Sequence, residues 1–521
     1  MIGLPAAGIS SFVADRPASS AAGSRAASGQ PPVLPPPAST VVTLGGSDAF
    51  PLRTYTAVQA ISPVDDVPSD EVFARMLGGN AAAQSVAEQF RGVGAALLER
   101  FGAGFDSDTP AASGVAGVGD AGLPSSDNAF ALEIRTVGGA VVRIVLGRGA
   151  DGRGLSAQVQ VAEGQVSDAE RAAIAKLATA FQTAIDGLTG DEPQLNLDGL
   201  VQYDTNALAS VDLKASVVLR PGQVQTLMFH ADAMRRSVDA AGPAGNVSVE
   251  VDLSNPALLG NARRQQQALD TYLAQFADAA QRGKGDSGLM QQFEAVFGAL
   301  HRPVDTDARP LGQGARAAVA NKVTASMLTG LADFRASVEE NPLGINPMRP
   351  GERETFSYTV SQQTEVGGSS AANLTVRQQQ QSHLSASYNE PLSPELSLML
   401  TTDPLTQNYY HYQIDDHSSS TTDVAYEDGE LARATLTQLA DQSTRRMKYV
   451  GGELVQDITT PRHEARKWNL LGMLKEAQRR DDHELRPDGS RVRQALSDIS
   501  DLVLLQSNPG GLLRKPTAAG A

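Results

Sequence analysis

Alternation of apolar and polar residues constrains the fold of this chain more than any other feature of its sequence. Between positions 130 and 161 it runs through three successive segments, the first two separated by Gly138-Gly139. A period of two residues is that of a β-strand, and paired glycines between two such segments are typical of a hairpin turn. The pattern predicts an antiparallel meander with one apolar and one polar face.

A helix is expected directly after this meander. Ser167 and Glu170 have the spacing of a capping box, and apolar residues from Ile174 to Leu188 recur at helical intervals. We expect the helix to cover the apolar face of the meander, because neither element buries its hydrophobic surface alone.

The rest of the sequence continues in blocks of strands and blocks of helices. A second β tract spans 208–253, and three amphipathic helices are expected between Pro256 and Val338. Long polar strands return over 351–460, and further helices are expected from Arg462 to Arg480 and from Val492 to Leu505. Segregated blocks predict an α+β fold, in which antiparallel β-meanders and hairpins are packed by amphipathic helices, with a central helical bundle.

The predicted organisation divides the chain into seven parts. They are a disordered tail (1–45), a helical segment and linker (46–127), a β-meander plus helix domain (128–253), a helical bundle (254–345), a polar β-hairpin domain (346–460), C-terminal helices (461–506) and a second tail (507–521). The first tail is assigned because its Ala, Ser, Pro and Gly residues cannot bury enough surface to offset the entropy of ordering.

Composition excludes several classes of function. The chain has no Cys, so disulfides, thiolate metal sites and a thiol nucleophile are excluded. A formal net charge of -16 disfavours nucleic-acid binding. No apolar run approaches the roughly 18 residues of a transmembrane segment, and no Sec signal is recognisable. We expect a soluble cytoplasmic protein, or one exported without a Sec signal; the oligomeric state stays open.

Known catalytic motifs are absent or lie in the wrong context. The segment Gly117–Gly122 matches G-x-G-x-x-G, but it lies in a Gly/Ala/Ser linker and precedes a strand instead of opening a helix. The sequence contains no P-loop, G-x-S-x-G, H-E-x-x-H or EF-hand motif. No catalytic residue and no cofactor are therefore predicted, and a non-enzymatic protein is favoured.

The candidate metal ligands are His411, Asp415 and His417. In a strand these three side chains share one face. About 13 Å separates His411 from Asp415 along an ideal strand, and about 7 Å separates Asp415 from His417, so only the second pair can share an ion. Two ligands do not make a site, so an ion needs further ligands from elsewhere in the chain. The alternative is that His411 and Asp415 are ordinary solvent-side residues, with Tyr410, Tyr412 and Ile414 on the core face.

A structural pattern runs from Phe130 to about Ala215: an amphipathic hairpin, an acidic-glycine turn, a Ser/Asp-capped helix and a further strand. It is carried by Leu132-Glu133-Ile134-Arg135-Thr136, Glu163-Gly164, Ser167, Glu170, Ala173-Ile174 and Leu208 to Leu213. This stretch resembles large uncharacterised proteins of Gram-negative bacteria. The resemblance implies a bacterial source, and it implies no activity, cofactor or catalytic residue.

Three functions are consistent with these features. The leading hypothesis is a non-enzymatic interaction or structural protein, whose Gln/Ser/Thr-rich hairpin from Glu354 to Tyr388 pairs with a protein partner by edge addition. The first alternative is a metal-dependent hydrolase with a site near Asp415 and His417. The second is a substrate of an unfolded-chain secretion system, with the N-terminal tail as its export signal.

Overall fold

The computed structural model describes residues 71–104, 128–148, 154–302, 321–395, 397–483 and 489–513. These residues belong to one compact unit, Val67–Ala521. The predicted tail over 1–45 and the G-x-G-x-x-G match at Gly117–Gly122 lie outside the described residues.

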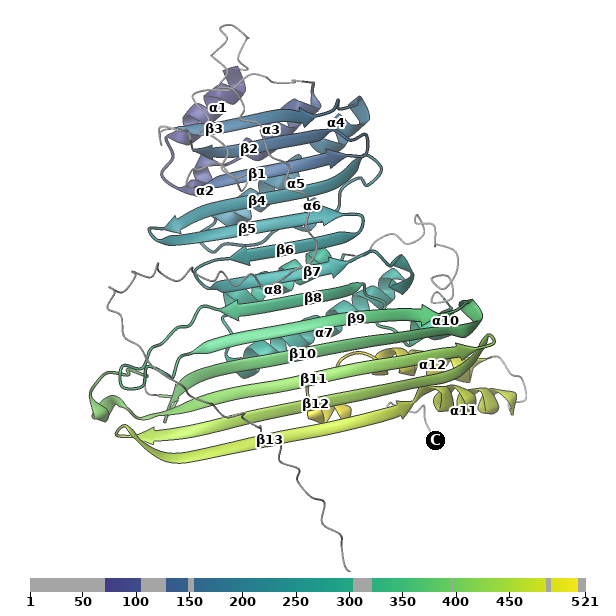
Figure 1. Cartoon of the computed structure of the whole chain (residues 1–521). Coiled ribbons are helices and arrows are strands. Elements are labelled where there is room, and N and C mark those ends of the chain that lie inside the picture. Colours follow the sequence, from purple (N-terminus) through teal and green to yellow (C-terminus); the bar gives the residue numbers. More distant parts are fainter. Residues whose placement is uncertain are drawn as a thin grey trace, which may run out of the picture. The chain divides into compact units, whose positions relative to one another are not determined.

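Thirteen strands organise this unit. They are β1 (Ala129–Thr136), β2 (Val141–Arg148), β3 (Leu155–Glu163), β4 (Leu208–Arg220), β5 (Gln223–Asp232), β6 (Arg235–Ala241), β7 (Gly245–Asp252), β8 (Asp333–Glu340), β9 (Thr355–Gly368), β10 (Leu374–Pro391), β11 (Tyr409–Glu427), β12 (Glu430–Val450) and β13 (Glu453–Asn469). All of them join one antiparallel sheet in the order β13 to β4 and then β1-β2-β3 (Figure 1). Strands that follow one another in the sequence from β4 to β13 therefore lie side by side, whereas β4 lies beside β1 and not beside β3.

Helices pack against one face of this sheet. The described helices are α1 (Glu71–Ala81), α2 (Val86–Gln89), α3 (Val93–Gly102), α4 (Asp168–Ala175), α5 (Ala178–Thr189), α6 (Asp198–Val201), α7 (Ala262–Gly283), α8 (Ser287–Leu300), α10 (Lys322–Ser326), α11 (Leu470–Asp482), α12 (Ser490–Leu502) and α13 (Pro509–Leu512). Helix α3 contacts β3, α5 contacts β4, α8 contacts β6 to β8, and α7 contacts β10 (Figure 1).

The predicted meander is confirmed. Strands β1, β2 and β3 pair in antiparallel order, and the even-numbered apolar residues of β1 and β2 are fully buried. The capping box is also confirmed, since Ser167 accepts a hydrogen bond from the Glu170 N–H and Glu170 accepts one from the Ser167 N–H at 2.8 Å. The helix after it is divided into α4 and α5.

Helices α7 and α8 lie on the sheet and are joined to it by aromatic side chains. The ring of Phe276 on α7 lies 4.8 Å from Phe293 on α8 and 5.6 Å from Tyr358 on β9. Phe297 on α8 contacts Phe334 on β8 at 5.1 Å between ring centroids. Because the apolar faces of both helices are used on the sheet, the fold is richer in sheet than the predicted α+β arrangement with a central helical bundle.

The third helix expected in that bundle is wrong. Its residues form the short helix α10 and then strand β8. Phe334, Ala336 and Val338 are buried on β8 and alternate with more exposed side chains. Residues 334 and 338 fit both a helical and a two-residue period, and pairing with β7 and β9 decides between the two.

The helix expected from Arg462 to Arg480 is wrong in its first half. Strand β13 continues to Asn469, because its backbone pairs with β12 up to the partners Thr435 and Asn469. Helix α11 begins only at Leu470. The helix expected from Val492 corresponds to α12.

The start of the first helix expected after the second β tract also differs from prediction. Pro256 opens a short 3-10 helix, Pro256–Leu258, whereas α7 starts at Ala262 after the cap residue Asn261. The sheet itself runs through the predicted domain boundaries after 253, 345 and 460.

Edge addition at the hairpin from Glu354 to Tyr388 is wrong. The hairpin forms as expected, as β9 and β10, but β9 also pairs with β8 and β10 also pairs with β11. Its edges are therefore occupied within the chain over residues 357–362 of β9 and residues 375–391 of β10. Among the described strands, only β3 and β13 have an unpaired edge.

The two faces of the sheet differ in character. On β7, Val247, Val249 and Val251 are buried against helices, while the residues between them are more exposed. The opposite side, called here the uncovered face, carries mainly Ser, Thr, Gln, His and charged side chains. No helix in the described part of the chain is long and apolar enough to cross a membrane.

Candidate metal centre

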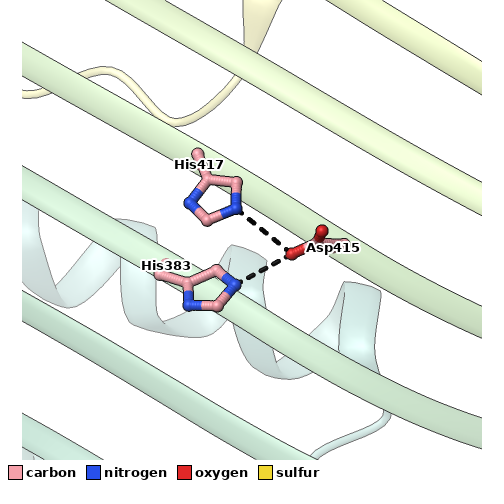
Figure 2. Close-up of side chains that lie close together, drawn as sticks. All are labelled: His383, Asp415 and His417. Atoms are coloured by element: carbon pink, nitrogen blue, oxygen red, sulfur yellow. Dashed lines mark hydrogen bonds and ion pairs between the residues drawn. The ribbon is translucent and has the colours of Figure 1, made fainter. Parts of the chain in front are cut away.

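Three potential metal ligands meet on the uncovered face of the sheet. His383 comes from β10, and Asp415 and His417 come from β11 (Figure 2). Each offers one ligand atom, and the three atoms lie within 4.8 Å of one another. Among the described residues, no other group of three His, Asp or Glu side chains meets this criterion.

The register between β10 and β11 creates the cluster. His383 lies directly opposite His417 in this antiparallel pair. Directly opposed residues place their side chains on the same face, and Asp415 is on that face because it is two residues from His417. The strand period and the register are thus sufficient to bring the three side chains together.

Both imidazole rings point the same nitrogen at one carboxylate oxygen. The Nε2 atom of His383 lies 2.8 Å from Oδ1 of Asp415, and the Nε2 atom of His417 lies 3.3 Å from the same oxygen (Figure 2). The two rings are stacked, with centroids 4.1 Å apart and planes 9° from parallel. The three ligand atoms therefore already converge without the help of an ion.

These separations suit a small divalent ion. Zinc binds imidazole nitrogen and carboxylate oxygen at about 2.0–2.2 Å in tetrahedral geometry, which places two ligand atoms about 3.4 Å apart. The two nitrogen–oxygen separations, 2.8 and 3.3 Å, both lie below that value, so small side-chain rotations that move the ligand atoms apart would admit the ion. The same groups also form hydrogen bonds to each other in the absence of an ion, and this hydrogen-bonded arrangement is the alternative interpretation of the cluster.

Exposure decides what such an ion would contact. The side chains of His383, Asp415 and His417 are 42%, 64% and 56% exposed. An ion held by three protein ligands at an open surface keeps coordination positions for water or for a ligand, which is the arrangement of catalytic and not of structural zinc sites. Metal-bound water can act as a nucleophile near neutral pH.

His411, the third predicted ligand, is not part of the cluster. It lies on the same face of β11, as predicted, but the residue is 1% exposed and its Nδ1 atom lies 2.8 Å from Oδ1 of Asn389. Burial lowers the pKa of His411 below its usual value. The prediction of a solvent-side His411 is wrong, because residues beyond the neighbouring strand ends cover this corner of the sheet.

The cover over that corner is held by a polar network. Glu352 accepts hydrogen bonds from the hydroxyls of Tyr409 at 2.6 Å and Tyr449 at 2.7 Å. The guanidinium of Arg349 lies over the Tyr449 ring, 4.2 Å from its centroid. The core of this corner also includes Met447 and the partly buried Leu398. His411 is thereby separated from the open part of the face, where Asp415 and His417 lie.

The line of directly opposed residues that contains His383 and His417 continues onto β12 and β13. Asp441 on β12 lies opposite His417, and His463 on β13 lies opposite Asp441. The Nδ1 atom of His463 is 3.8 Å from Oδ2 of Asp441. His463 thus lies on the same face as the cluster but outside it.

His230, which also lies on the uncovered face, is held differently. His230 on β5 has Nδ1 at 2.7 Å from Oδ1 of Asp212 and Nε2 at 3.1 Å from Oδ2 of Asp232. The hydrogen bond to Asp212 is the largest cause that raises the pKa of His230. Both ring nitrogens are occupied by carboxylates on opposite sides of the ring, so this group favours an imidazolium and not a metal ion.

Sequence reasoning missed His383. It lies in the Gln/Ser/Thr-rich strand β10, 34 positions before His417 along the chain. A register between β10 and β11 would have found it, because that register alone places the two histidines opposite each other.

Comparisons with protein-family models, with curated proteins and with solved structures find no match for this chain. The resemblance of residues 130–215 to uncharacterised proteins of Gram-negative bacteria therefore stays a prediction.

Proposed function

We propose that this protein binds a divalent transition-metal ion, with zinc as the first candidate, through His383, Asp415 and His417. The observation that carries the proposal is the convergence of both Nε2 atoms on one oxygen of Asp415. Two imidazoles and a carboxylate are ligands that zinc, iron(II) and related ions accept. The ligands come from two adjacent strands of a paired ladder, so the sheet holds them in place before an ion arrives.

A zinc titration of the full-length chain tests this function. The protein is first freed of metal with a chelator, and zinc chloride is then added in a calorimeter while the variants His383→Ala and His417→Ala are measured in parallel. We expect one zinc ion per chain, and an affinity more than about tenfold lower in each variant, because removal of a direct ligand costs at least as much as removal of an outer contact.

His463→Ala is the matched control for this titration. It removes the same type of side chain from the same face, 59% exposed and outside the cluster. We expect it to bind zinc as the unchanged protein does. The proposal fails if no stoichiometric binding is seen, or if His463→Ala weakens binding as much as His417→Ala does.

A metal-dependent hydrolase is the activity that an open site of this kind favours, and it remains an alternative to simple binding. Three protein ligands leave room for a metal-bound water. Hydrolysis of a p-nitrophenyl ester by the zinc-loaded protein, compared with Asp415→Asn under the same conditions, tests it. A rate that does not depend on Asp415 or on zinc would exclude this activity at the cluster.

A second candidate function is that of an interaction protein, and the unpaired edge of β13 favours it. Leu454, Val455 and Ile458 on this edge strand are 48%, 56% and 41% exposed. An exposed edge with apolar side chains can accept an additional strand from a partner. Pro461 cannot donate a backbone hydrogen bond, so Glu453–Thr460 is the part of the edge best suited to pairing.

Sedimentation over a range of protein concentrations tests this second candidate. We expect concentration-dependent association of the unchanged chain, which Ile458→Lys reduces because a charge on the edge opposes strand pairing. Met228→Lys is the control, since Met228 is 55% exposed on β5 in the interior of the sheet. A monomer at all concentrations, or equal association of both variants, would argue against self-association through β13.

A further inference from the structure

A small cavity lies on the face of the sheet that the helices cover. Its volume is about 260 Å³. Strands β9 to β13 form its floor, the last turns of α7 form its roof, and Ser507 and Asn508, between α12 and α13, close one side. Asp416 and Ser418 on β11 line it, and they alternate with the metal-cluster residues of the same strand. A ligand in the cavity would therefore lie across the sheet from the candidate metal centre.

One line of directly opposed residues on β9 to β13 forms most of the floor. Its members are Tyr358, Leu384, Asp416, Gln442 and Arg462. The first four are buried, whereas Arg462 is exposed, as are Asp278 and Gln281 on α7. The cavity therefore opens to solvent near these three exposed side chains and has a buried inner end at β9 to β11.

The hydroxyl group of Tyr358 is the unexplained feature of the inner end. Tyr358 is 2% exposed, and its hydroxyl has no hydrogen-bond partner in the described part of the chain. The Ser382 hydroxyl lies nearby, but it is already hydrogen-bonded to the Ser418 hydroxyl at 2.7 Å. Burial raises the pKa of Tyr358, so its hydroxyl stays protonated and can donate. Because an unsatisfied buried hydroxyl is unfavourable, we expect a bound molecule to accept this hydrogen bond.

The charged side chains of the lining balance one another. Arg282 donates from Nε and Nη2 to the Asp416 carboxylate, and its Nη1 group donates to none of the described residues. Arg462 and Asp278, at the opening, form no ion pair within the described ranges. Two arginines and two aspartates give the lining no net charge, while they supply both donors and acceptors. Such a lining favours a neutral ligand that carries donors and acceptors of its own.

We propose that this cavity binds a neutral polyhydroxylated molecule of about the size of a monosaccharide. Each hydroxyl group of such a molecule both donates and accepts, so it can accept from Tyr358 and Arg282 and donate to Asp278. Leu384 and Ala279, both buried, provide an apolar surface for C–H groups. At roughly 30 Å³ for each water molecule, the cavity has room for about eight waters, which is enough for one sugar ring.

Calorimetry on the full-length protein tests the inference with four probes. Glucose and myo-inositol are neutral polyols, gluconate is a polyol with a carboxylate, and serine is a zwitterion. We expect at least one neutral polyol to bind, one molecule per chain, and more tightly than gluconate or serine. If neither neutral polyol binds at millimolar concentrations, the cavity holds water only and the inference is overturned. Tighter binding of gluconate or serine would also overturn it.

Tyr358→Phe is the decisive variant, and Tyr388→Phe is its matched control. Tyr388 is half-buried on β10, where its ring stacks on Tyr412 with centroids 5.0 Å apart, and it does not line the cavity. We expect Tyr358→Phe to weaken polyol binding about two- to tenfold, since one hydrogen bond is lost, and to leave urea unfolding unchanged. Tyr388→Phe should leave the affinity unchanged. An affinity that Tyr358→Phe does not lower contradicts the proposed site.

A second pair of variants decides the question if Tyr358→Phe does not fold. Asp278 and Asp270 are both exposed on α7, and of the two only Asp278 lines the cavity. Asp278→Ala should weaken polyol binding, because an acceptor at the opening is lost, and Asp270→Ala should not. Equal affinities of these two variants would then overturn the inference. Removal of zinc with a chelator should not change polyol binding, so this inference and the metal-binding function fail separately.

Discussion

Replacement of Glu170 by Gln tests how the first helix after the meander is fixed to the sheet. The Glu170 carboxylate accepts hydrogen bonds from the Gly138 N–H at 2.9 Å and from the Ser167 N–H and hydroxyl, both at 2.8 Å. It therefore joins the start of α4 to the turn between β1 and β2. The residue is 7% exposed.

The size of the expected loss of stability follows from the pKa of this carboxyl group. Hydrogen bonds, of which the one from the Thr136 side chain is the largest cause, lower the pKa of Glu170 from 4.5 to about 2. A difference of that size corresponds to about 3 kcal/mol of stability. Gln keeps one acceptor oxygen, so we expect Glu170→Gln to lower the free energy of unfolding by about 1–3 kcal/mol at neutral pH.

The sign of the pH dependence is fixed by the direction of the shift. Because the pKa is lower in the folded than in the unfolded state, the stabilisation is fully present above pH 4.5 and is lost as the pH falls toward 2. We therefore expect the difference in stability between Glu170→Gln and the unchanged protein to shrink over that range.

Urea unfolding, followed at several pH values together with amide hydrogen exchange at Gly138, measures this effect. Glu163→Gln, at the exposed end of β3, is the matched control. A loss below about 0.5 kcal/mol at neutral pH, or a difference that stays constant down to pH 2, would refute the proposed role of the carboxylate.

Three further predictions concern buried charge and the metal centre. Burial lowers the pKa of His301 to about 4, so the free energy of unfolding of the unchanged protein should fall by up to about 3 kcal/mol between pH 6.5 and pH 4. His301→Leu should remove most of that loss, and urea titrations at the two pH values measure it. Asp416, whose side chain is 10% exposed, pairs with Arg282. Asp416→Asn should destabilise the protein by about 2–3 kcal/mol, because the arginine then loses its counter-charge. Asp457→Asn, which removes an exposed pair with Arg445, should have a much smaller effect in the same unfolding assay. Zinc affinity should fall on acidification, since both imidazoles must be neutral to bind, and calorimetry at two pH values measures the change.

Local patterns in the sequence predicted the parts of the fold that depend on local interactions. The meander over 130–161 and the capping box at Ser167 are recognisable because alternation and cap spacing are local properties. The pattern around β8 predicts a helix, because positions 334 and 338 fit either period and only pairing with β7 and β9 selects the strand. The first half of the helix expected at Arg462 is a strand for the same reason, since β12 provides its backbone partners.

The candidate site also has a part that local sequence predicts and a part that depends on distant segments of the chain. The pair Asp415 and His417 followed from strand geometry alone, whereas His383 depends on the register of β10 and β11, which are connected by a segment too long to set that register from sequence. The burial of His411 depends on residues such as Glu352 that fold over the end of β11. No local signal marks which part of a strand face will be covered by a distant segment.

The strand order bears on how the chain is assembled during translation. From β5 onward each new strand pairs with the one made immediately before it, so its partner has already left the ribosome when it emerges. No completed ladder has to open to admit a later strand, and most of the contacts closed at each step are near in sequence, which favours fast folding. The exception is the pair of β7 and β8, which residues 253–332 separate. At every stage of synthesis beyond β4, the growing rim is the most recently made strand, and β13 is the strand at which this growth stops.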